Sequence, residues 1–306
     1  MNIIRHKYIF LVFSGILVCA SIIALLVWGL RPGIDFTGGS LLEVEFAAGK
    51  RPDTEEIARG LQSVGLDGAL VQPAGERAII IRAPRMDESA RQRVLARMTE
   101  FVSTGQNSGS EVLERRFEDV GPTLGRELRR RSVAALGIAS AAIVLYIAWA
   151  FRQVSRPVPS WKYGLVAVAA LIHDVIIPAG VFAVLGHFRG VEVDALFVSA
   201  LLTIMGFSVH DTIVVFDRIR ENLQREKSPE HFAATVNRSI TQTLARSVNT
   251  SLTVLVVLAT IFFVGGATTR WFALSLIIGI TAGTYSSIFV ASPLVVVWND
   301  LTRNKG

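Results

Sequence analysis

The sequence predicts an α-helical polytopic membrane protein with six transmembrane helices, plus an α+β ferredoxin-like domain between helices 1 and 2. Hydrophobic residues make up 51% of the 306 residues, and the mean hydropathy is +0.47. Apolar runs of eighteen or more residues recur along the chain. That length matches the roughly 30 Å hydrocarbon core of a bilayer, so the composition excludes a soluble protein.

Six apolar runs are long enough to cross a membrane. We expect spans at Tyr8–Leu30, Ser132–Phe151, Tyr163–Leu185, Ala195–Phe216, Ser247–Val264 and Trp271–Trp298. The first run is too long for the apolar core of a signal peptide, and no small-x-small cleavage site follows it, so we expect it to stay as a helix. Pro178 frees a backbone carbonyl in the third run and predicts a kink there.

The orientation follows from Lys and Arg in the short loops between spans. One side holds Arg5, Lys7, Arg152, Arg156, Lys162, the basic residues of the segment 218–246, Arg303 and Lys305. The other side's short loops hold only Arg189 and Arg270. We therefore expect both termini on the cytoplasmic side, with residues 1–30 as N-terminus and first helix, 31–131 as an outer domain and 132–306 as the remaining helices. The basic run 126–131 opposes this rule, but a long translocated domain precedes it, and such domains cross regardless of charge.

The outer domain, 31–131, has the element order of a ferredoxin-like fold. Alternating apolar and polar residues predict strands over 40–47 and 110–120, and two short strands at Ala69–Gln72 and Ala78–Arg82 flank a turn with Pro73 and Gly75. Helical spacing predicts helices over 53–64 and 86–102. The resulting order is β-α-β-β-α-β. Because this stretch holds no Ser/His/Asp set, Cys pair or phosphate loop, we expect a binding or lever domain and no enzyme.

Ionisable residues recur inside the predicted spans. His173 and Asp174 lie in the third, His210 and Asp211 lie in the fourth, and Arg246 lies at the start of the fifth. A charge at mid-bilayer costs roughly 2.5–3.5 kcal/mol on insertion scales, so such residues predict a function. We interpret them as a proton-coupling site, because hydrocarbon and a nearby guanidinium have opposite effects on a carboxylate.

Helical spacing places these residues on polar stripes. In the fourth span the stripe is Ser199, Thr203, Gly206 and His210, flanked by Asp211 on the face of Ala200 and Ser208; in the fifth span it is Arg246, Asn249, Thr250 and Thr253. Small residues let helices approach closely, so we expect the two stripes to face each other. The sequence therefore predicts an ion pair between Asp211 and Arg246 at similar depth.

Several alternatives stay open at this point. The polar residues could serve only as hydrogen-bonding contacts between helices, and His210 could be either a relay or a satisfied neighbour of Asp211. No metal-ligand spacing occurs on one helix, so we expect no metal. No basic patch is interleaved with aromatics, so we expect no nucleic-acid binding. The charges after Phe216 are typical of a helix leaving the membrane, followed by a cytoplasmic amphipathic helix or hairpin up to Arg246.

The stretch "GIDFTGG" follows the first span. Its residues Gly33, Asp35, Gly38 and Gly39 are typical of a turn in which glycine supplies a positive φ or lets two backbones approach. We interpret it as a structural motif, since it is weak as a ligand site.

Six segments together resemble a known family. They are "GIDFTGG", "VGPTLGREL" before the second span, "LIHDV" in the third, "DTIVVFDRIREN" in the fourth, "ITQTLARSVNTS" before the fifth and "GTYSSIF" in the sixth. In order and spacing they resemble the SecF proteins of bacterial protein export, in the SecD/SecF family of the RND superfamily.

The resemblance implies a multi-pass protein of the bacterial inner membrane, with a periplasmic first loop, that works with SecD and the SecYEG translocon. It implies use of the proton motive force in late translocation of a polypeptide, with protons as coupling ion and no cofactor. Contacts with membrane lipids and with YajC and YidC are also among the expected partners. In the family, the positions of Asp211 and Arg246 are proton-coupling groups. The residue before that aspartate is commonly Asn, and here it is His210.

Two other functions remain candidates. An RND-type exporter of small molecules or lipids would need an apolar pocket in the outer domain, and 31–131 shows none in its pattern. A passive scaffold would tolerate apolar replacement of Asp211 and Arg246 together.

Overall fold

The computed structural model describes residues 2–47, 51–66, 68–104, 111–150, 159–225 and 232–303. The chain divides into two compact units. One contains residues 1–31 and 133–306, and the other contains residues 32–132.

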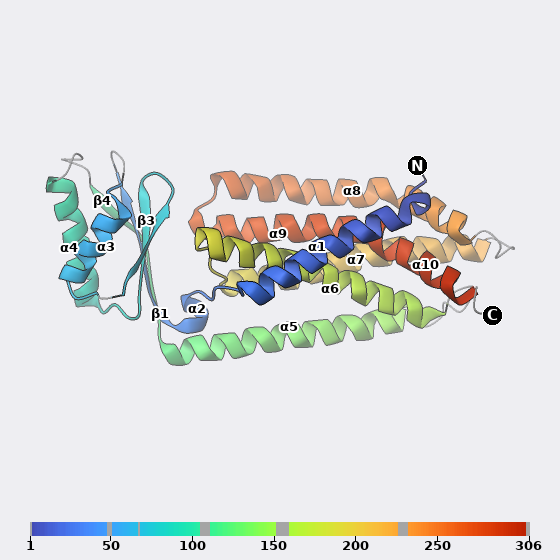
Figure 1. The fold of residues 1–306 in the computed structure, drawn as a ribbon, viewed down its shortest axis with the longest axis horizontal. Coiled ribbons are helices and arrows are strands. Elements are labelled where there is room, and N and C mark those ends of the chain that lie inside the picture. The colour runs from blue at the N-terminus through green and yellow to red at the C-terminus, as the bar shows by residue number, and fades with distance from the viewer. Residues whose placement is uncertain are drawn as a thin grey trace. The chain divides into compact units, whose positions relative to one another are not determined.

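The smaller unit is a four-stranded antiparallel sheet with two helices. Its elements are β1 (Gly39–Phe46), α3 (Thr54–Ser63), β2 (Leu70–Ala74), β3 (Ala78–Ala83), α4 (Glu88–Thr104) and β4 (Val112–Val120). The strand order is β2-β3-β1-β4, and every neighbouring pair is antiparallel. Figure 1 shows α3 and α4 together on one face of this sheet. The predicted ferredoxin-like order is confirmed.

Alternation along the strands builds the core of this unit. Leu42, Val44 and Phe46 on β1 are fully buried, and Ile79 and Ile81 on β3 lie beside them. The helices complete the core with Ile57, Leu61, Val94, Met98 and Val102. One expectation was wrong in detail, because Pro73 lies inside β2 and the turn consists of residues 75–77. An edge strand accepts proline, since its outer N–H has no ladder partner.

The predicted turn motif after the first span, Gly33–Gly39, packs against the segment "VGPTLGREL", residues 120–128. Gly33 caps a one-turn helix, α2 (Ile34–Thr37), that contains Asp35. Gly38 has φ +75°, and a Cβ there would lie 2.9 Å from the Cα of Pro122. Gly39 has φ +127°, and its Cβ would lie 2.8 Å from the carbonyl oxygen of Ala83. Both reasons for glycine, positive φ and close backbone approach, therefore apply.

Gly39→Ala is expected to destabilise the smaller unit by about 1–3 kcal/mol, because alanine at this φ is strained and also meets a backbone carbonyl. The change should appear as faster hydrogen exchange at the amides of β1 and β3 in the intact protein. Gly121→Ala is the matched control, since a Cβ at Gly121 meets nothing within 4 Å. Equal exchange rates in the two variants would contradict this reading of the motif.

Asp87 caps α4. Its Oδ1 accepts hydrogen bonds from the backbone N–H of Ala90 at 2.7 Å and from the Ser89 hydroxyl at 2.9 Å. These two hydrogen bonds, that from Ala90 first, hold the pKa of Asp87 below its ordinary value of 3.8. A lowered pKa in the folded state means that the cap stabilises the helix above about pH 3.8 and that this contribution is lost as the pH falls through the lowered value.

Asp87→Ala is therefore expected to speed hydrogen exchange at the first turn of α4 at pH 7. The difference from the native protein should shrink as the pH falls from 3.8 through the lowered pKa of Asp87, because the native cap is then progressively protonated. Asp53→Ala provides a comparison, since the Asp53 side chain makes no cap hydrogen bond to α3. A pH-independent difference would show that the charge of Asp87 does not contribute.

The larger unit is a helical bundle. It consists of α1 (Lys7–Val27), most of α5 (Pro122–Ala150), α6 (Ser160–Arg189), α7 (Ala195–Arg225), α8 (Phe232–Val264), α9 (Ala267–Ser286), a π-helical turn (Ser287–Ala291) and α10 (Ser292–Arg303). Among the residues that the structure describes, six helical segments are long and apolar enough to cross a membrane, as predicted. Figure 1 shows α8 beside α9 and α1 crossing α6, and each of these pairs is in contact. Glycine permits two of the crossings: a Cβ at Gly180 would lie 2.5 Å from the Cα of Ser21, and one at Gly279 would overlap the Ile204 side chain.

The helices α7 and α8 both extend beyond their predicted spans into the segment 218–246. The segment 218–246 belongs to the end of α7 and the start of α8, which pack together, so within its described residues it forms a helical hairpin and no separate amphipathic helix. Asn222 joins the two arms, because its Nδ2 donates to the Ser239 hydroxyl and to Gln242 Oε1, each at 2.8 Å. α6 continues through Pro178 as one helix. Arg152, Arg156 and Lys305, which contributed to the predicted orientation, lie outside the described residues.

Candidate proton-coupling site

Asp174 is the most enclosed carboxylate of the bundle. It lies on α6 with none of its surface exposed. Its Oδ2 accepts hydrogen bonds from the hydroxyls of Ser208 on α7, at 2.5 Å, and Ser286 on α9, at 2.7 Å. His173 Nδ1 lies 2.7 Å from Oδ1. Three helices therefore supply the partners of one buried carboxylate, which is how a buried charge is made tolerable.

Asp211 forms a second, similar centre on α7. It is 7% exposed, and its Oδ1 accepts a hydrogen bond from the Ser247 hydroxyl of α8 at 2.6 Å. Its Oδ2 accepts one from the hydroxyl of Ser287, the first residue of the π turn. The fourth and fifth spans are therefore joined through a serine and a carboxylate.

Two consecutive serines of the sixth span thus donate hydrogen bonds, one to each of the two carboxylates. Ser286 ends α9 and contacts Asp174, and Ser287 begins the π turn and contacts Asp211. The Ser292 hydroxyl donates to the Ser287 carbonyl at 3.1 Å, five residues back, as a π turn allows. Gly283 makes room beside them, because a Cβ there would lie 3.3 Å from Ser208 Cβ and 3.5 Å from Asp174 Oδ2. Single π turns are frequent at functional sites.

The predicted ion pair between Asp211 and Arg246 is wrong for this chain by itself. Arg246 is exposed, and within the part of the chain that the structure describes it makes no ion pair with Asp211. Its neighbour Ser247 contacts Asp211, so Arg246 and Asp211 do lie at the same level of the bundle. The α-helical turn of about 100° per residue sends the two side chains of α8 in different directions, and the serine is the one that reaches the carboxylate.

The predicted stripe of small residues on the fourth span also faces outward. Ser199, Thr203, Gly206 and His210 are exposed, and a Cβ at Gly206 would meet nothing within 4 Å. The exposed face of α8 carries the predicted stripe of Arg246, Asn249, Thr250 and Thr253. Ala200, Ser208 and Asp211 lie on the buried face of α7, and from this face Asp211 contacts Ser247 of α8. His210 and Asp211 therefore point to opposite environments, and His210 is no contact of the carboxylate in this chain.

Sequence reasoning missed the serines that hold the carboxylates. Ser247, Ser286 and Ser287 are all at most 2% exposed. The two serines of the segment "GTYSSIF" are the sequence signal for these contacts, and hydropathy does not detect it because serine is only weakly polar. A further buried polar atom, Nε2 of His173, has no hydrogen-bond partner among the described residues. It leaves this imidazole able to accept or donate one more hydrogen bond beside Asp174.

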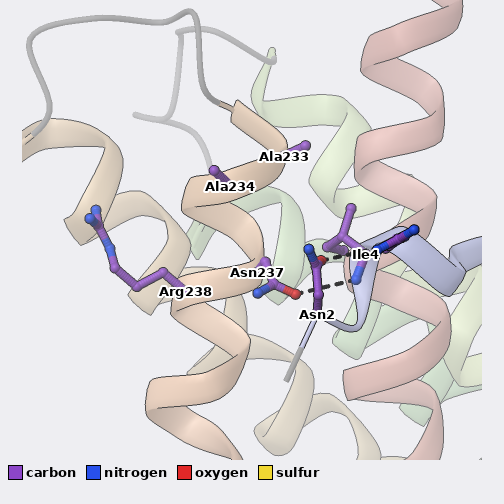
Figure 2. A pocket seen from close by; sticks show the side chains of 7 residues that line it. Asn2, Ile4, Ala233, Ala234, Asn237 and Arg238 are labelled. Carbon is purple, nitrogen blue, oxygen red and sulfur yellow. Dashed lines mark hydrogen bonds between the residues drawn. The ribbon is translucent and has the colours of Figure 1, made fainter.

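An open pocket of about 390 Å³ lies elsewhere, between the N-terminus and α8. Figure 2 shows Asn237 directed at the first residues of the chain, where its Oδ1 accepts hydrogen bonds from the backbone N–H groups of Ile3, at 2.8 Å, and Ile4, at 3.3 Å. The lining is Asn2, Ile4, Arg5, Ala233, Ala234, Asn237 and Arg238, without either carboxylate. The described residues contain no group of three or more His, Cys, Asp or Glu side chains placed to hold a metal ion.

Comparison with known proteins identifies the family. Residues 101–301 match the family model for the protein export membrane protein SecD/SecF, C-terminal part, and residues 23–49 match that for the SecD/SecF GG motif. The chain is 44% identical to the protein translocase subunit SecF of Thermobaculum terrenum and 41% identical to that of Anaerolinea thermophila, with 98% of this chain and 94% of each relative covered.

Longer relatives contain the same region. The chain is 34% identical to the protein translocase subunit SecDF of Bacillus subtilis, with 98% of this chain and 38% of that relative covered. The crystal structure of SecDF from Thermus thermophilus, described as a translocon-associated membrane protein, matches with a TM-score of 0.82 at 33% identity, covering 98% of this chain and 39% of that one. The chain thus spans about two fifths of these SecDF proteins. The fold, the two matched motifs and the near full-length likeness to SecF proteins together show that the chain belongs to the SecD/SecF family of protein-export membrane proteins.

Proposed function

We propose that this chain acts with SecD as a SecF-type subunit that uses the proton motive force to promote the late stage of polypeptide translocation across the bacterial inner membrane. The observation that carries the proposal is the pair of buried carboxylates, Asp174 and Asp211, each hydrogen-bonded across helices. A buried acid inside a membrane bundle is costly, and proton relays are among the roles for which such residues are retained.

Serine partners suit a site that must hold a proton in one state and lose it in the other. A hydroxyl donates to an ionised carboxylate and accepts from a protonated one, so the contact survives both states. Around Asp211, Ser247 and Ser287 give this option on two sides. Protonation would then change the direction of hydrogen bonds between α7, α8 and the π turn and bias how these helices pack.

The exposed polar stripes of α7 and α8 support a partner within the membrane. Exposed polar groups are poor neighbours for lipid, and here they include His210 and Arg246 at the level of Asp211. The SecDF relatives carry more than twice the length of this chain in one polypeptide, so we assign SecD as the partner that covers these stripes. In the assembled pair, Arg246 is a positive charge at the level of Asp211 that SecD covers.

The remaining expectations follow from this proposal. Both termini lie in the cytoplasm, the unit of residues 32–132 lies on the periplasmic side, where it contacts the moving polypeptide, and the chain needs no cofactor and catalyses no reaction. The SecYEG translocon is the machine that the pair assists, with YajC and YidC as further associated proteins.

The direct test is translocation in vesicles containing SecYEG, SecD and this chain. We expect a proton gradient to speed completion of export, and we expect the stimulation to disappear when this chain or SecD is left out or when a protonophore is added. Full stimulation with the gradient collapsed would contradict proton coupling. Full stimulation without the chain would contradict its part in export.

A further inference from the structure

Hydrogen bonds and the covalent frame of Ser287 connect the two buried carboxylates through the sixth span. Asp174 Oδ2 accepts from the Ser286 hydroxyl at 2.7 Å, and the same hydroxyl lies 3.1 Å from the Gly283 carbonyl oxygen. That carbonyl also accepts a hydrogen bond from the backbone N–H of Ser287. The Ser287 hydroxyl then donates to Asp211 Oδ2. Adjacent hydrogen bonds in a low-dielectric interior polarise one another, so a change at one end is felt at the other.

Each serine hydroxyl has two acceptors between which its single proton can turn. Ser286 reaches Asp174 or the Gly283 carbonyl, and Ser287 reaches Asp211 or the Thr284 carbonyl, 3.1 Å away. Next to an ionised carboxylate the hydroxyl donates to the carboxylate. Next to a protonated one the acid donates, and the serine proton turns to the carbonyl. Protonation of Asp174 therefore alters the hydrogen bonding of the Gly283 carbonyl, which holds the backbone of Ser287.

We infer that Ser286 and Ser287 are positioning residues that couple the two carboxylates, so that binding a proton at Asp174 changes the proton affinity of Asp211 and the reverse. The inference rests on the proposed function only in treating Asp211 as the proton-exchanging group. It adds Asp174 as a second titrating member and names Ser286, the last residue of α9, and Ser287, the first residue of the π turn, as the link.

Other charged or titratable groups flank the pair on the packed helices. They are His173 on α6, His210 on α7, Arg246 on α8, Tyr285 on α9, and Lys7 with Asp300 at the ends of α1 and α10. His173 contacts Asp174, whereas His210 and Arg246 are exposed. The Tyr285 hydroxyl donates to the Phe10 carbonyl at 3.2 Å, and Lys7 pairs with Asp300 at 2.6 Å. Among these groups only His173 touches one of the two buried carboxylates, Asp174, and it does not contact Asp211.

The test is a pH titration of the carboxyl bands by infrared difference spectroscopy, on the full chain with ¹³C-labelled aspartate in lipid nanodiscs. Asp211→Asn and Asp174→Asn assign the two bands. We expect Ser286→Ala, which removes a contact of Asp174, to move the titration midpoint of Asp211 by about 1 pH unit, the size that marks interacting sites. Ser287→Ala should likewise move the midpoint of Asp174.

The controls separate coupling from general disturbance. Ser275→Ala removes an equally buried serine of α9 whose hydroxyl bonds only to the Phe272 carbonyl, so it should move neither midpoint. Ser286→Thr keeps the hydroxyl and should restore the native midpoint of Asp211. Should Ser286→Ala fail to fold, Ser287→Ala still tests the link, because it must move the midpoint of Asp174, a carboxylate that Ser287 does not touch.

Two results would overturn the inference: a serine variant that moves only the carboxylate it touches, or an Asp174→Asn variant that leaves the Asp211 midpoint in place. Both are read without any transport measurement. Failure of proton-stimulated export in the vesicle assay would overturn the proposed function and leave this titration result standing.

Discussion

Asp211→Asn is expected to abolish the stimulation of export by a proton gradient while leaving the chain folded and able to assemble with SecD. Asparagine keeps the shape and an acceptor oxygen for Ser247 or Ser287, but it cannot exchange a proton at any physiological pH. One charge moved through 100 mV supplies about 2.3 kcal/mol, roughly a fifty-fold bias on a conformational equilibrium. Loss of the exchanging group removes that bias. The measurement is the export rate in vesicles with and without the gradient.

Asp217→Asn is the matched control for this variant. Asp217 lies on the same helix, its side chain is 63% exposed, and its ion pair with Arg220 spans 3.6 Å. It should retain the full stimulation. Arg246→Gln is a second test variant. The isolated chain should keep its stability, because Arg246 is exposed. The pair assembled with SecD should lose the stimulation of export by the proton gradient. Stimulation that persists in Asp211→Asn would remove Asp211 from the mechanism.

Asp174→Ala is expected to cause the largest loss of stability among single substitutions in the bundle. Removing the carboxylate leaves two buried hydroxyls without this acceptor and the His173 ring without its partner. Each unsatisfied buried group costs about 1–3 kcal/mol, and breaking a buried charged network costs about 3–5 kcal/mol. Some relief comes from backbone carbonyls, such as that of Gly283, which can take the serine protons. We expect a net loss of about 3 kcal/mol in the free energy of unfolding in detergent micelles.

Asp174→Asn should lose clearly less than Asp174→Ala, because the amide still offers an acceptor in the same volume. Asp217→Ala gives the baseline for removing an exposed aspartate, which should fall within about 1 kcal/mol of the native value. If Asp174→Ala were as stable as Asp217→Ala, the hydrogen bonds around Asp174 would contribute little to packing. That outcome would favour a purely functional reason for keeping the carboxylate.

The spans and the smaller unit were predictable because each depends on a pattern that local residues carry. Length and hydropathy identify a spanning helix without knowledge of its neighbours. The alternation in 40–47 identifies β1 because one of its faces is buried. Pro73 shows the limit of this reasoning, since a proline is read as a break until the strand is known to be at the edge of its sheet.

The pairing inside the bundle was not predictable because helical spacing tells which residues share a face, not which face points inward. The stripe with His210 and the face with Asp211 were both candidates for the contact, and small residues favoured the wrong one. Opposite charge likewise favoured Arg246 as the partner of Asp211, whereas the adjacent Ser247 makes the hydrogen bond to that carboxylate. The π turn adds a local change that a 3.6-residue period cannot represent.

Because Ser286 and Ser287 are adjacent, the helical register determines which carboxylate each of them contacts. Side chains of consecutive helical residues point about 100° apart, so one short segment reaches α6 with one serine and α7 with the next. Deleting or inserting a single residue between Gly283 and Ser286 would rotate both hydroxyls by about 100° away from these carboxylates. The same change near Trp298, beyond these contacts, would leave the serine hydrogen bonds to both carboxylates in place. Before Ser286 and Ser287, the number of residues in the sixth span therefore matters as much as the identity of the two serines.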